Sequence, residues 1–537
     1  MSSASQLDAD VLIVGAGPVG LSMALELGLR GRRVVLIERD PSRGPQPRAK
    51  TLNMRSLGHM RRWGVADAVR AASPNPPDLP TDIVFQTRLF GHHLATLPNI
   101  YFRGNERQHD ERFPEPSEWI PQYLVEQALK AKLETLDNVS IRYGVELLNF
   151  EQTPGEVLAT LNAKGEDIAL RSRFIVGADG ARSRVRALIG AEMVGRHAMA
   201  SHFNVVMRIP ELDTLQPPVR GIMHWIINGD TPCVMGPMGP HWHIGKTLAE
   251  GEADLTRDQV ADFLKSATGR DLDFEIVSTD RWYAHELVAD RYRDRNAFLV
   301  GDACHLHPPF GGYGMNMGIA DAVDLGWKLD AVLGGWGGER LLESYEWERK
   351  RVHRWTIDES LENYKTLARD LDIPGLEDDT EMGAQIRQGL GQAVIAVKRR
   401  EFHTIGIVLG YHYGGSPVVV GGEDLPGPVA EEYHPVAEPG AMAPHFWLEP
   451  GVSVYDRFGR GLTLIDTVGD LEGRGLFHQA AQAAGVPLKE LVLTGERAKA
   501  LYGEDLFLVR PDEHVAWRGR IGSVAEADAL LKTVTGA

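Results

Sequence analysis

Short, continuous apolar runs alternate with helical segments in the first part of the chain. Residues 10–14 (DVLIV) and 34–37 (VVLI) are two such runs, and an amphipathic helical pattern fills the interval between them. Runs that are apolar at every position are typical of strands buried on both faces, so this order predicts a parallel sheet. The runs at 174–176 and 297–300 predict further strands, and the second leads into a helical pattern at 319–333.

Other segments follow different periods. Residues 82–90 and 203–282 contain runs of alternating character, which predict a second, separate sheet. Residues 141–176 are predicted as strands that rejoin the first sheet, and residues 122–129 as a helix. A Gly/Pro-rich stretch at 414–444 marks a boundary before the last hundred residues.

A glycine-rich turn joins the first two apolar runs: Gly15-Ala16-Gly17-Pro18-Val19-Gly20. Gly15 permits the tight turn, Gly17 and Pro18 open the helix where a pyrophosphate approaches the backbone, and Gly20 lets helix and strand pack closely. Glu38 lies 18 residues after Gly20, where an acid binds the ribose hydroxyls of an adenosine. The motif predicts a dinucleotide site without separating NAD from FAD.

Two later loops suit the same kind of ligand. One strand is followed by Gly177-Ala178-Asp179-Gly180, and another by Gly301-Asp302 with a glycine-rich turn into a helix. A carboxylate there accepts hydrogen bonds from a polyol, and the helix start offers free N–H groups. The three motifs, in this order, resemble the class A (single-component) flavoprotein monooxygenases, the para-hydroxybenzoate and phenol hydroxylase family. The resemblance covers nearly the whole chain and selects FAD.

The resemblance implies an α/β protein with a Rossmann-like FAD-binding domain, an interleaved β-sheet substrate domain and a thioredoxin-like C-terminal domain. We expect the FAD-binding core in residues 1–400 (about 1–80, 105–200 and 285–400), the substrate sheet in about 81–104 and 201–284, a linker at 401–444, and the thioredoxin-like domain at 445–537. The last domain has no cysteine and cannot exchange dithiols. Stabilising the enzyme or forming a homodimer are the roles expected of it.

The resemblance also assigns residues to the cofactor. Arg48 matches an arginine at the FAD pyrophosphate, with a solvated surface arginine as the alternative, and Gln122 matches a glutamine at the ribityl chain. Asp302 is expected to bind a ribityl hydroxyl. Asp179 is expected near the ribityl or nicotinamide path, or else to cap its own turn. The helix start is expected to direct backbone N–H groups at the flavin pyrimidine edge, through Gly314, Met315 and Asn316.

The reaction implied is the hydroxylation of a phenolic or polycyclic aromatic compound. In the family, FAD reduced by NADPH or NADH takes up O₂ as a C4a-hydroperoxide, which passes one oxygen to the substrate. Pro309, beside Pro308, is expected to shape the peroxide pocket. Arg39 and Arg43 suit a 2′-phosphate and favour NADPH. A Baeyer–Villiger oxygenase and a flavin-binding partner without turnover stay open as alternatives.

The substrate side is expected on strands of the second sheet. Alternation places Met223 and Trp225 on one face and His224 on the other. The first two are candidate substrate contacts, with an ordinary sheet core as the alternative, and His224 is a candidate catalytic residue for phenol deprotonation. Tyr313 is expected to face the substrate side of the flavin, as a catalytic or substrate residue.

Composition excludes several other functions. The chain has 537 residues, 43% apolar and 24% charged, which is typical of a globular enzyme of two or three domains. Its net charge of −17 disfavours nucleic acid and anionic membranes. No apolar run is long enough to span a bilayer, and no leader segment is recognised, so a cytoplasmic protein is expected. Cys304, His305 and His307 give no complete ligand set, so no metal is expected.

Overall fold

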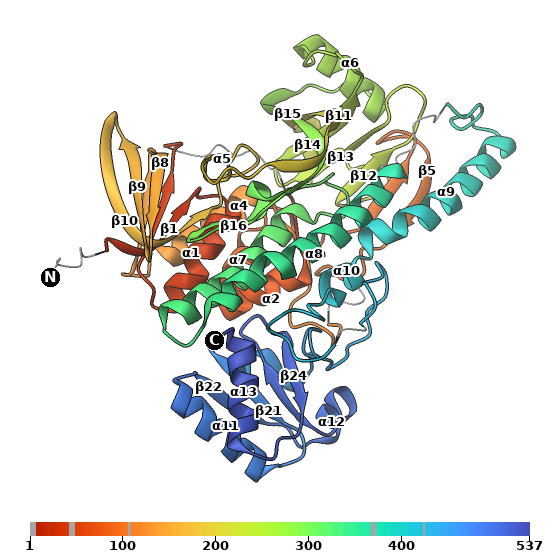
Figure 1. Ribbon diagram of the computed structural model, residues 1–537. Coiled ribbons are helices and arrows are strands. Elements are labelled where there is room, and N and C mark those ends of the chain that lie inside the picture. Colours follow the sequence, from red (N-terminus) through yellow and green to blue (C-terminus); the bar gives the residue numbers. More distant parts are fainter. Residues whose placement is uncertain (1–6, 42–48, 106–108, 367–371, 423–424) are drawn as a thin grey trace.

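The computed structural model describes residues 7–41, 49–105, 109–366, 372–422 and 425–537. Figure 1 shows two large sheets with long helices packed between and below them, and a smaller domain formed by the C-terminal residues. No helix in these ranges combines the length and apolar character needed to cross a membrane.

The first sheet carries the nucleotide-type motifs. Its main path runs β16–β17–β10–β1–β2–β7, and a hairpin of β8 and β9 extends from β10. The strands are β1 (Ala9–Val14), β2 (Val34–Glu38), β7 (Val139–Tyr143), β8 (Val145–Thr153), β9 (Glu156–Ala163), β10 (Glu166–Gly177), β16 (Arg293–Asp294) and β17 (Ala297–Leu299). Strands β17, β10, β1, β2 and β7 are parallel, and β1 is buried along nearly its whole length, as its unbroken apolar run predicts.

The register of this sheet brings the three motifs together. Val14 at the end of β1 pairs with Gly177 at the end of β10, and Gly177 pairs with Leu299 at the end of β17. Because the three strands are parallel, the loops that follow them leave the same edge of the sheet. Segments more than 100 residues apart in the chain therefore form one ligand-facing edge.

Helices cover this sheet and close the core. They are α1 (Pro18–Leu29), α2 (Met54–Arg62), α3 (Ala66–Ala71), α4 (Gln122–Leu133), α5 (Arg184–Leu188) and α7 (Gly314–Leu333). Helix α1 packs against both α4 and α7. A short two-stranded ribbon joins β3 (Thr51–Leu52) to β6 (Glu118–Trp119) beside them.

The second sheet is a broad, mostly antiparallel layer in the order β18–β15–β11–β14–β13–β12–β4–β5. Its strands are β4 (Ile83–Gln86), β5 (His93–Leu97), β11 (Met193–Arg208), β12 (Met223–Ile226), β13 (Cys233–Met238), β14 (His241–Leu248), β15 (Glu275–Ala289) and β18 (His305–Leu306). Helix α6 (Arg257–Thr268) begins with a capping box of Thr256 and Gln259 and packs its apolar side on the core beneath this sheet. Strand β18 follows the Gly301–Asp302 turn directly, so the cofactor-type edge and this sheet are adjacent.

Long helices follow α7. Helices α8 (Glu339–Lys365) and α9 (Glu381–Phe402) cross the molecule beside the second sheet, and α9 packs on β5. The short helix α10 (Ile405–Gly410) then leads into irregular chain with few strands before β19 (Trp447–Glu449) and β20 (Val452–Ser453).

The C-terminal domain has the strand order and directions of a thioredoxin fold. Its sheet runs β22–β21–β23–β24, with β21 and β22 parallel and the other pairs antiparallel. The elements are β21 (Leu462–Asp466), α11 (Leu471–Ala484), β22 (Leu488–Val492), α12 (Glu496–Tyr502), β23 (Leu506–Val509), β24 (Val515–Gly519) and α13 (Val524–Thr535).

A buried ion cluster fixes this domain to the core. Arg510, which follows β23, contacts Glu348 of α8 at 2.6 Å and Asp324 of α7 at 3.0 Å, as well as Asp512 at 2.6 Å. Lys328 joins the same acids at 2.9 Å to Asp324 and 2.5 Å to Glu348. All five side chains are at most 3% exposed, so the charges compensate one another out of water.

Candidate functional site

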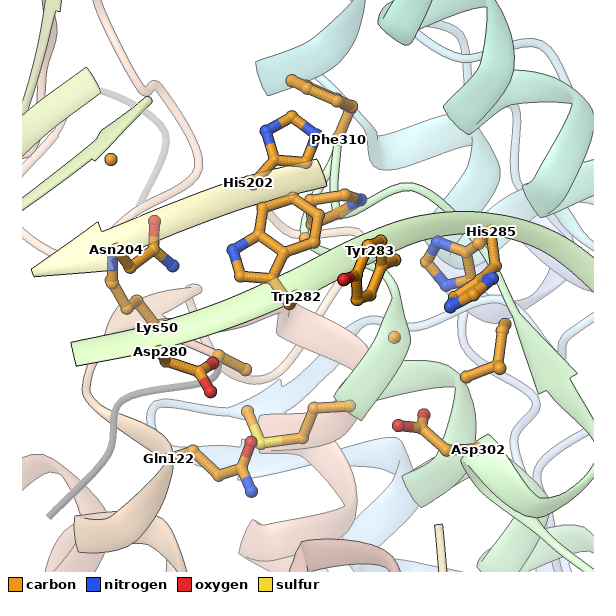
Figure 2. Close-up of a pocket in the computed structure, with 18 of the residues that line it drawn as sticks. Lys50, Gln122, His202, Asn204, Asp280, Trp282, Tyr283, His285, Asp302 and Phe310 are labelled. Atoms are coloured by element: carbon orange, nitrogen blue, oxygen red, sulfur yellow. The ribbon is translucent and has the colours of Figure 1, made fainter. Parts of the chain in front are cut away.

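A large cavity lies between the ligand-facing edge of the first sheet and one face of the second. Its volume is about 2130 Å³, well above the roughly 300–1,000 Å³ of a site for one drug-sized molecule. In Figure 2, His202, Asn204 and Trp282 of the second sheet lie on one side, and Gln122 and Asp302 on the other. The cavity therefore has room for a dinucleotide and a second molecule.

The glycine-rich turn forms part of the cavity wall. Gly15 has φ +104°, and a Cβ there would lie 2.4 Å from the carbonyl oxygen of Ala178. Gly17 precedes α1 and no side chain caps that helix, so its first N–H groups are open to an anion. Gly15, Gly17 and Pro18 line the cavity, whereas Gly20 lies behind it, where a Cβ would overlap the carbonyl of Gly15.

The acid at the end of β2 lies at the same wall. Glu38 accepts a hydrogen bond from the Ala16 N–H at 2.9 Å, which ties it to the glycine-rich turn. Both Glu38 and Arg39 line the cavity. The two other arginines predicted here, Arg43 and Arg48, lie outside the described residues.

Most of the remaining residues predicted to bind the cofactor line the cavity, and Asn316 does not. Gln122, Asp302, Pro309, Gly314 and Met315 line the cavity. The amide of Gln122 donates to Glu126 at 2.8 Å, one turn along α4.

Asp179 lines the cavity but also caps a helix. Its carboxylate accepts from the Ser183 hydroxyl at 2.5 Å and from the backbone N–H of Arg184 at 2.6 Å and of Val185 at 3.1 Å, at the start of α5. Burial raises the pKa of Asp179, and these hydrogen bonds oppose the rise. Asp179 therefore has the role given as its alternative, since its carboxylate caps its own turn.

Comparison with known proteins identifies the chain's family. A family model of the FAD binding domain matches residues 8–360, and a model of the aromatic-ring hydroxylase C-terminal domain matches residues 436–537. The chain belongs to the FAD-dependent aromatic-ring hydroxylases.

Relatives of the hydroxylase extend over most of its length. It is 30% identical to the FAD-dependent monooxygenase apdD of Emericella nidulans, over 98% of this chain and 90% of that protein. It is 32% identical to aklavinone 12-hydroxylase DnrF of Streptomyces peucetius, over 82% and 87% of the two chains. Chromopyrrolic acid-soaked RebC with bound 7-carboxy-K252c is 34% identical and superposes with a TM-score of 0.90 over 99% of this chain and 100% of that one. A ternary complex of aklavinone-11 hydroxylase with FAD and aklavinone gives a TM-score of 0.85 at 27% identity, over the same shares.

The walls of the cavity fit FAD. The cradle at Gly15 would be filled by any side chain, the uncapped start of α1 suits a pyrophosphate, and Asp302 lies farther along the same edge, where its carboxylate can accept from a ribityl hydroxyl. The start of α7 also lacks a side-chain cap, which leaves its N–H groups for an electron-rich ring edge. The hydroxylase therefore offers a continuous path for the whole cofactor.

Asn316 contributes through its side chain and is not among the residues that line the cavity. Its Oδ1 accepts from the Asn53 N–H at 3.0 Å, and its amide donates to the carbonyls of Thr51 at 2.9 Å and Gly312 at 2.7 Å. The residue thus ties the start of α7 to the β3 ribbon and to the glycine-rich turn.

Asn316→Ala is expected to lower the free energy of unfolding by about 1–3 kcal/mol, because it removes the partner of three part-buried backbone groups. Urea unfolding followed by circular dichroism measures the change. Asn162→Ala is the matched control, since its hydrogen bonds to Asp167 and Gly165 are exposed and their loss should cost under about 1 kcal/mol. Equal losses in the two variants would contradict the role assigned to Asn316.

A cluster behind the Gly301–Asp302 turn brings four metal-binding side chains within 4.8 Å of one another: Cys304, His305, Asp321 and His353. Hydrogen bonds account for this arrangement. The Asp321 carboxylate contacts the Gly301 N–H at 3.0 Å, the Arg349 guanidinium at 2.7 Å, and Nε2 of His305 and His353 at 3.0 and 2.8 Å. Burial alone would raise the pKa of Asp321, but His353 and Arg349 hold it well below its ordinary range. The cluster anchors the loop that presents Asp302.

Two candidate catalytic residues, Tyr313 and His224, are not among the residues that line the cavity. Tyr313 is buried in a cluster with Met54, Tyr101 and Phe113 and is not among the residues lining the cavity, because the turn at Gly311 and Gly312 directs its side chain away. His224 faces the opposite side of the second sheet, where its Nδ1 lies 3.2 Å from the Gln86 amide. Strand alternation predicted this orientation of His224. Because neither Tyr313 nor His224 lines the cavity, neither is retained as a catalytic candidate. Met223 and Trp225 do line the cavity.

The polar residues of the same cavity that were not among the predicted site residues include Lys50, Asn204 and His243. Strand alternation in the sequence could have identified two of them, Asn204 and His243. Asn204 pairs with Gly245 across β11 and β14, and His243, two residues from Gly245, shares its face. Lys50 comes from the chain just before β3, with no periodic pattern around it.

Proposed function

We propose that this hydroxylase acts on a bulky phenolic or polycyclic aromatic compound, with NADPH preferred as reductant. The face that the second sheet turns to the cavity carries the proposal. Its register sets one residue from each of six strands in a row, all of them lining the cavity: Asp280, Asn204, Gly245, Val234, Trp225 and Phe85. One end of the row is polar and the other is apolar and aromatic, as a hydroxylated planar ring requires.

The oxygen-transfer chemistry comes from FAD when it is bound. The residues of the chain position the reactants and exclude water. Phe85, Met223 and Trp225 give the substrate an apolar wall, and the residues of the three loops hold the cofactor opposite.

Pro309 stays in the proposal as a pocket-shaping residue at the cavity wall. Its neighbour Pro308 is fixed by the Ser360 hydroxyl, which donates to the Pro308 carbonyl at 2.5 Å. This bond links the segment to α8 and holds the peptide beside the cavity in one position.

A panel of mono- and polycyclic phenols tests the proposal. The FAD-loaded protein should consume NADPH faster in air when a substrate phenol is added, and mass spectrometry should find that phenol with one oxygen added to a ring carbon. An ester or lactone product would indicate the Baeyer–Villiger alternative instead. Unchanged NADPH consumption with every phenol, and no oxygenated product, would favour a flavin-binding protein without turnover.

The preference for NADPH follows from Arg39 beside Glu38 at the cavity wall, where a 2′-phosphate meets a positive charge. Steady-state oxidation of NADPH and NADH by the same preparation compares the two directly. A homodimer and a cytoplasmic location remain predictions, and light scattering of the FAD-loaded protein tests the first.

A further inference from the structure

Lys50 is an amine inside the cavity for which the described residues offer no partner. It lines the wall just before β3, and among the described residues no hydrogen bond or ion pair is formed by its ammonium group. In Figure 2 its side chain points toward the strand that carries Asn204. The other cavity lysines differ, since Lys246 contacts Glu252 at 3.1 Å and Lys398 contacts Glu401 at 2.9 Å.

Two further groups with unused hydrogen-bonding capacity lie on the sheet near Lys50. The Nδ1 atom of His243 is buried and has no hydrogen-bond partner within the described part of the chain. In the same ranges no side-chain hydrogen bond involves Asn204, and a Cβ at Gly245 would collide with its amide oxygen, so the glycine makes room for this side chain. His243 is buried, and Lys50 and Asn204 are partly buried. Leaving polar groups unpaired in such positions is costly, so the three together indicate a missing ligand.

The charges of the groups near Lys50, Asn204 and His243 indicate which kind of ligand these residues bind. Burial lowers the pKa of Lys50 to about 7, so near neutral pH its amine is present in both the neutral and the protonated form. Burial, together with the Lys50 charge, lowers the pKa of His243 well below its ordinary value and keeps that ring neutral. The other titratable groups on this sheet face are Asp280 of β15 and His202 of β11, and burial lowers the pKa of His202 to about 4.

We propose that Lys50, Asn204 and His243 bind the acidic hydroxyl of the aromatic substrate as its phenolate, with Lys50 as the catalytic base. The O–H bond breaks, its electron pair stays on oxygen, and the proton forms a new N–H bond at Nζ. The resulting ammonium then pairs with the phenolate. The phenolate thus supplies the opposite charge that the described residues do not give Lys50. The phenolate enriches the ring in electrons for oxygen transfer. This inference rests on the proposed function, that the cavity holds a phenol.

The ionisation of a coloured phenol tests this directly. The FAD-loaded protein is titrated with 4-nitrophenol, and the phenolate absorbance is followed against pH. Bound 4-nitrophenol should ionise at lower pH than in solution. Lys50→Met should raise the ionisation midpoint of the bound probe by about one to two pH units, since an opposite charge at contact distance shifts a pKa by that amount.

Controls separate a catalytic base from a merely structural lysine. Lys246→Met also removes a cavity lysine, but one whose charge is already paired, and should leave the midpoint unchanged. Nitrobenzene, which has no hydroxyl, should bind the native and Lys50→Met proteins equally. Turnover of any substrate phenol by Lys50→Met should recover as the pH is raised, because the phenol then ionises without a base.

Several results would overturn the proposal: no binding of 4-nitrophenol, binding only in its neutral form, the same midpoint in Lys50→Met and Lys246→Met, or binding of 4-nitrobenzoate in its place. A carboxylate brings no proton to transfer. Failure of the proposed function looks different, because the native protein would then hydroxylate no phenol while the Lys50-dependent ionisation of the probe persisted.

Discussion

Gly15→Ala is expected to yield protein that retains little or no FAD after purification. The added Cβ would lie 2.4 Å from the Ala178 carbonyl oxygen, and the residue would keep the left-handed φ of +104° only under strain. The left-handed region alone costs about 1–2 kcal/mol for a residue with a Cβ. The collision adds to this cost, and both Gly15 and Ala178 belong to loops that face the cofactor. The ratio of flavin absorbance to protein absorbance measures the loss.

Gly31→Ala separates the clash from the backbone strain. Gly31 also has a positive φ, +83°, but a Cβ there meets nothing within 4 Å. This variant should lose only about 1–2 kcal/mol of stability and keep its FAD. If Gly15→Ala retains as much FAD as Gly31→Ala, the turn does not approach the cofactor in the way the structure indicates.

Arg510→Met should be the most destabilising single substitution in the C-terminal domain, by about 3–5 kcal/mol, because it leaves the buried acids of the cluster with Lys328 alone as their cation. Arg510 is fully buried and contacts both Glu348 and Asp324 of the core. Chemical unfolding at pH 7 measures the loss. Arg457→Met is the control, because its contact with Glu449, at 3.9 Å, is exposed and worth at most about 1 kcal/mol.

The same substitution should change how stability depends on pH. Burial alone would raise the pKa of Glu348, but Arg510 and Lys328 lower it from 4.5 to about 2. A carboxyl whose pKa is lower in the folded state stabilises the protein above pH 4.5, and this contribution is lost as the pH falls toward 2. Removing Arg510 should shrink this acid-dependent loss. A parallel fall in stability for both proteins between pH 5 and 3 would contradict the assignment.

The sequence was sufficient for the parts of the fold that local patterns determine. Apolar runs predicted the strands of the first sheet, and the three motifs placed the ligand at their shared edge. The predicted boundaries of helices and strands were less accurate. Helix α7 begins at Gly314, earlier than 319, because the cavity loop and the Asn316 contacts stabilise a glycine-containing first turn. Within the β-rich sequence predicted at 82–90, only Ile83–Gln86 forms a strand, and the chain then turns between Thr87 and His92 into β5.

The substrate half of the site was harder to predict for a physical reason. Alternation separated Met223 and Trp225 from His224 correctly, but the sequence does not say which face of a sheet meets a cavity. His243 faces the cavity because β14 pairs with β11 and β13 in that register. Lys50 resembles any surface lysine in sequence. Its burial depends on strands about 150 to 200 residues later in the chain.

The ion cluster at Arg510 also has a consequence for how the protein is made. Ribosomes synthesise the chain from its N-terminus, and Arg510 follows Glu348 by 162 residues. At typical rates of translation this interval lasts roughly 10 to 30 s. Throughout it, the nascent core holds two acids next to Lys328 alone, so the FAD-binding part reaches its final stability only after Arg510 has been synthesised.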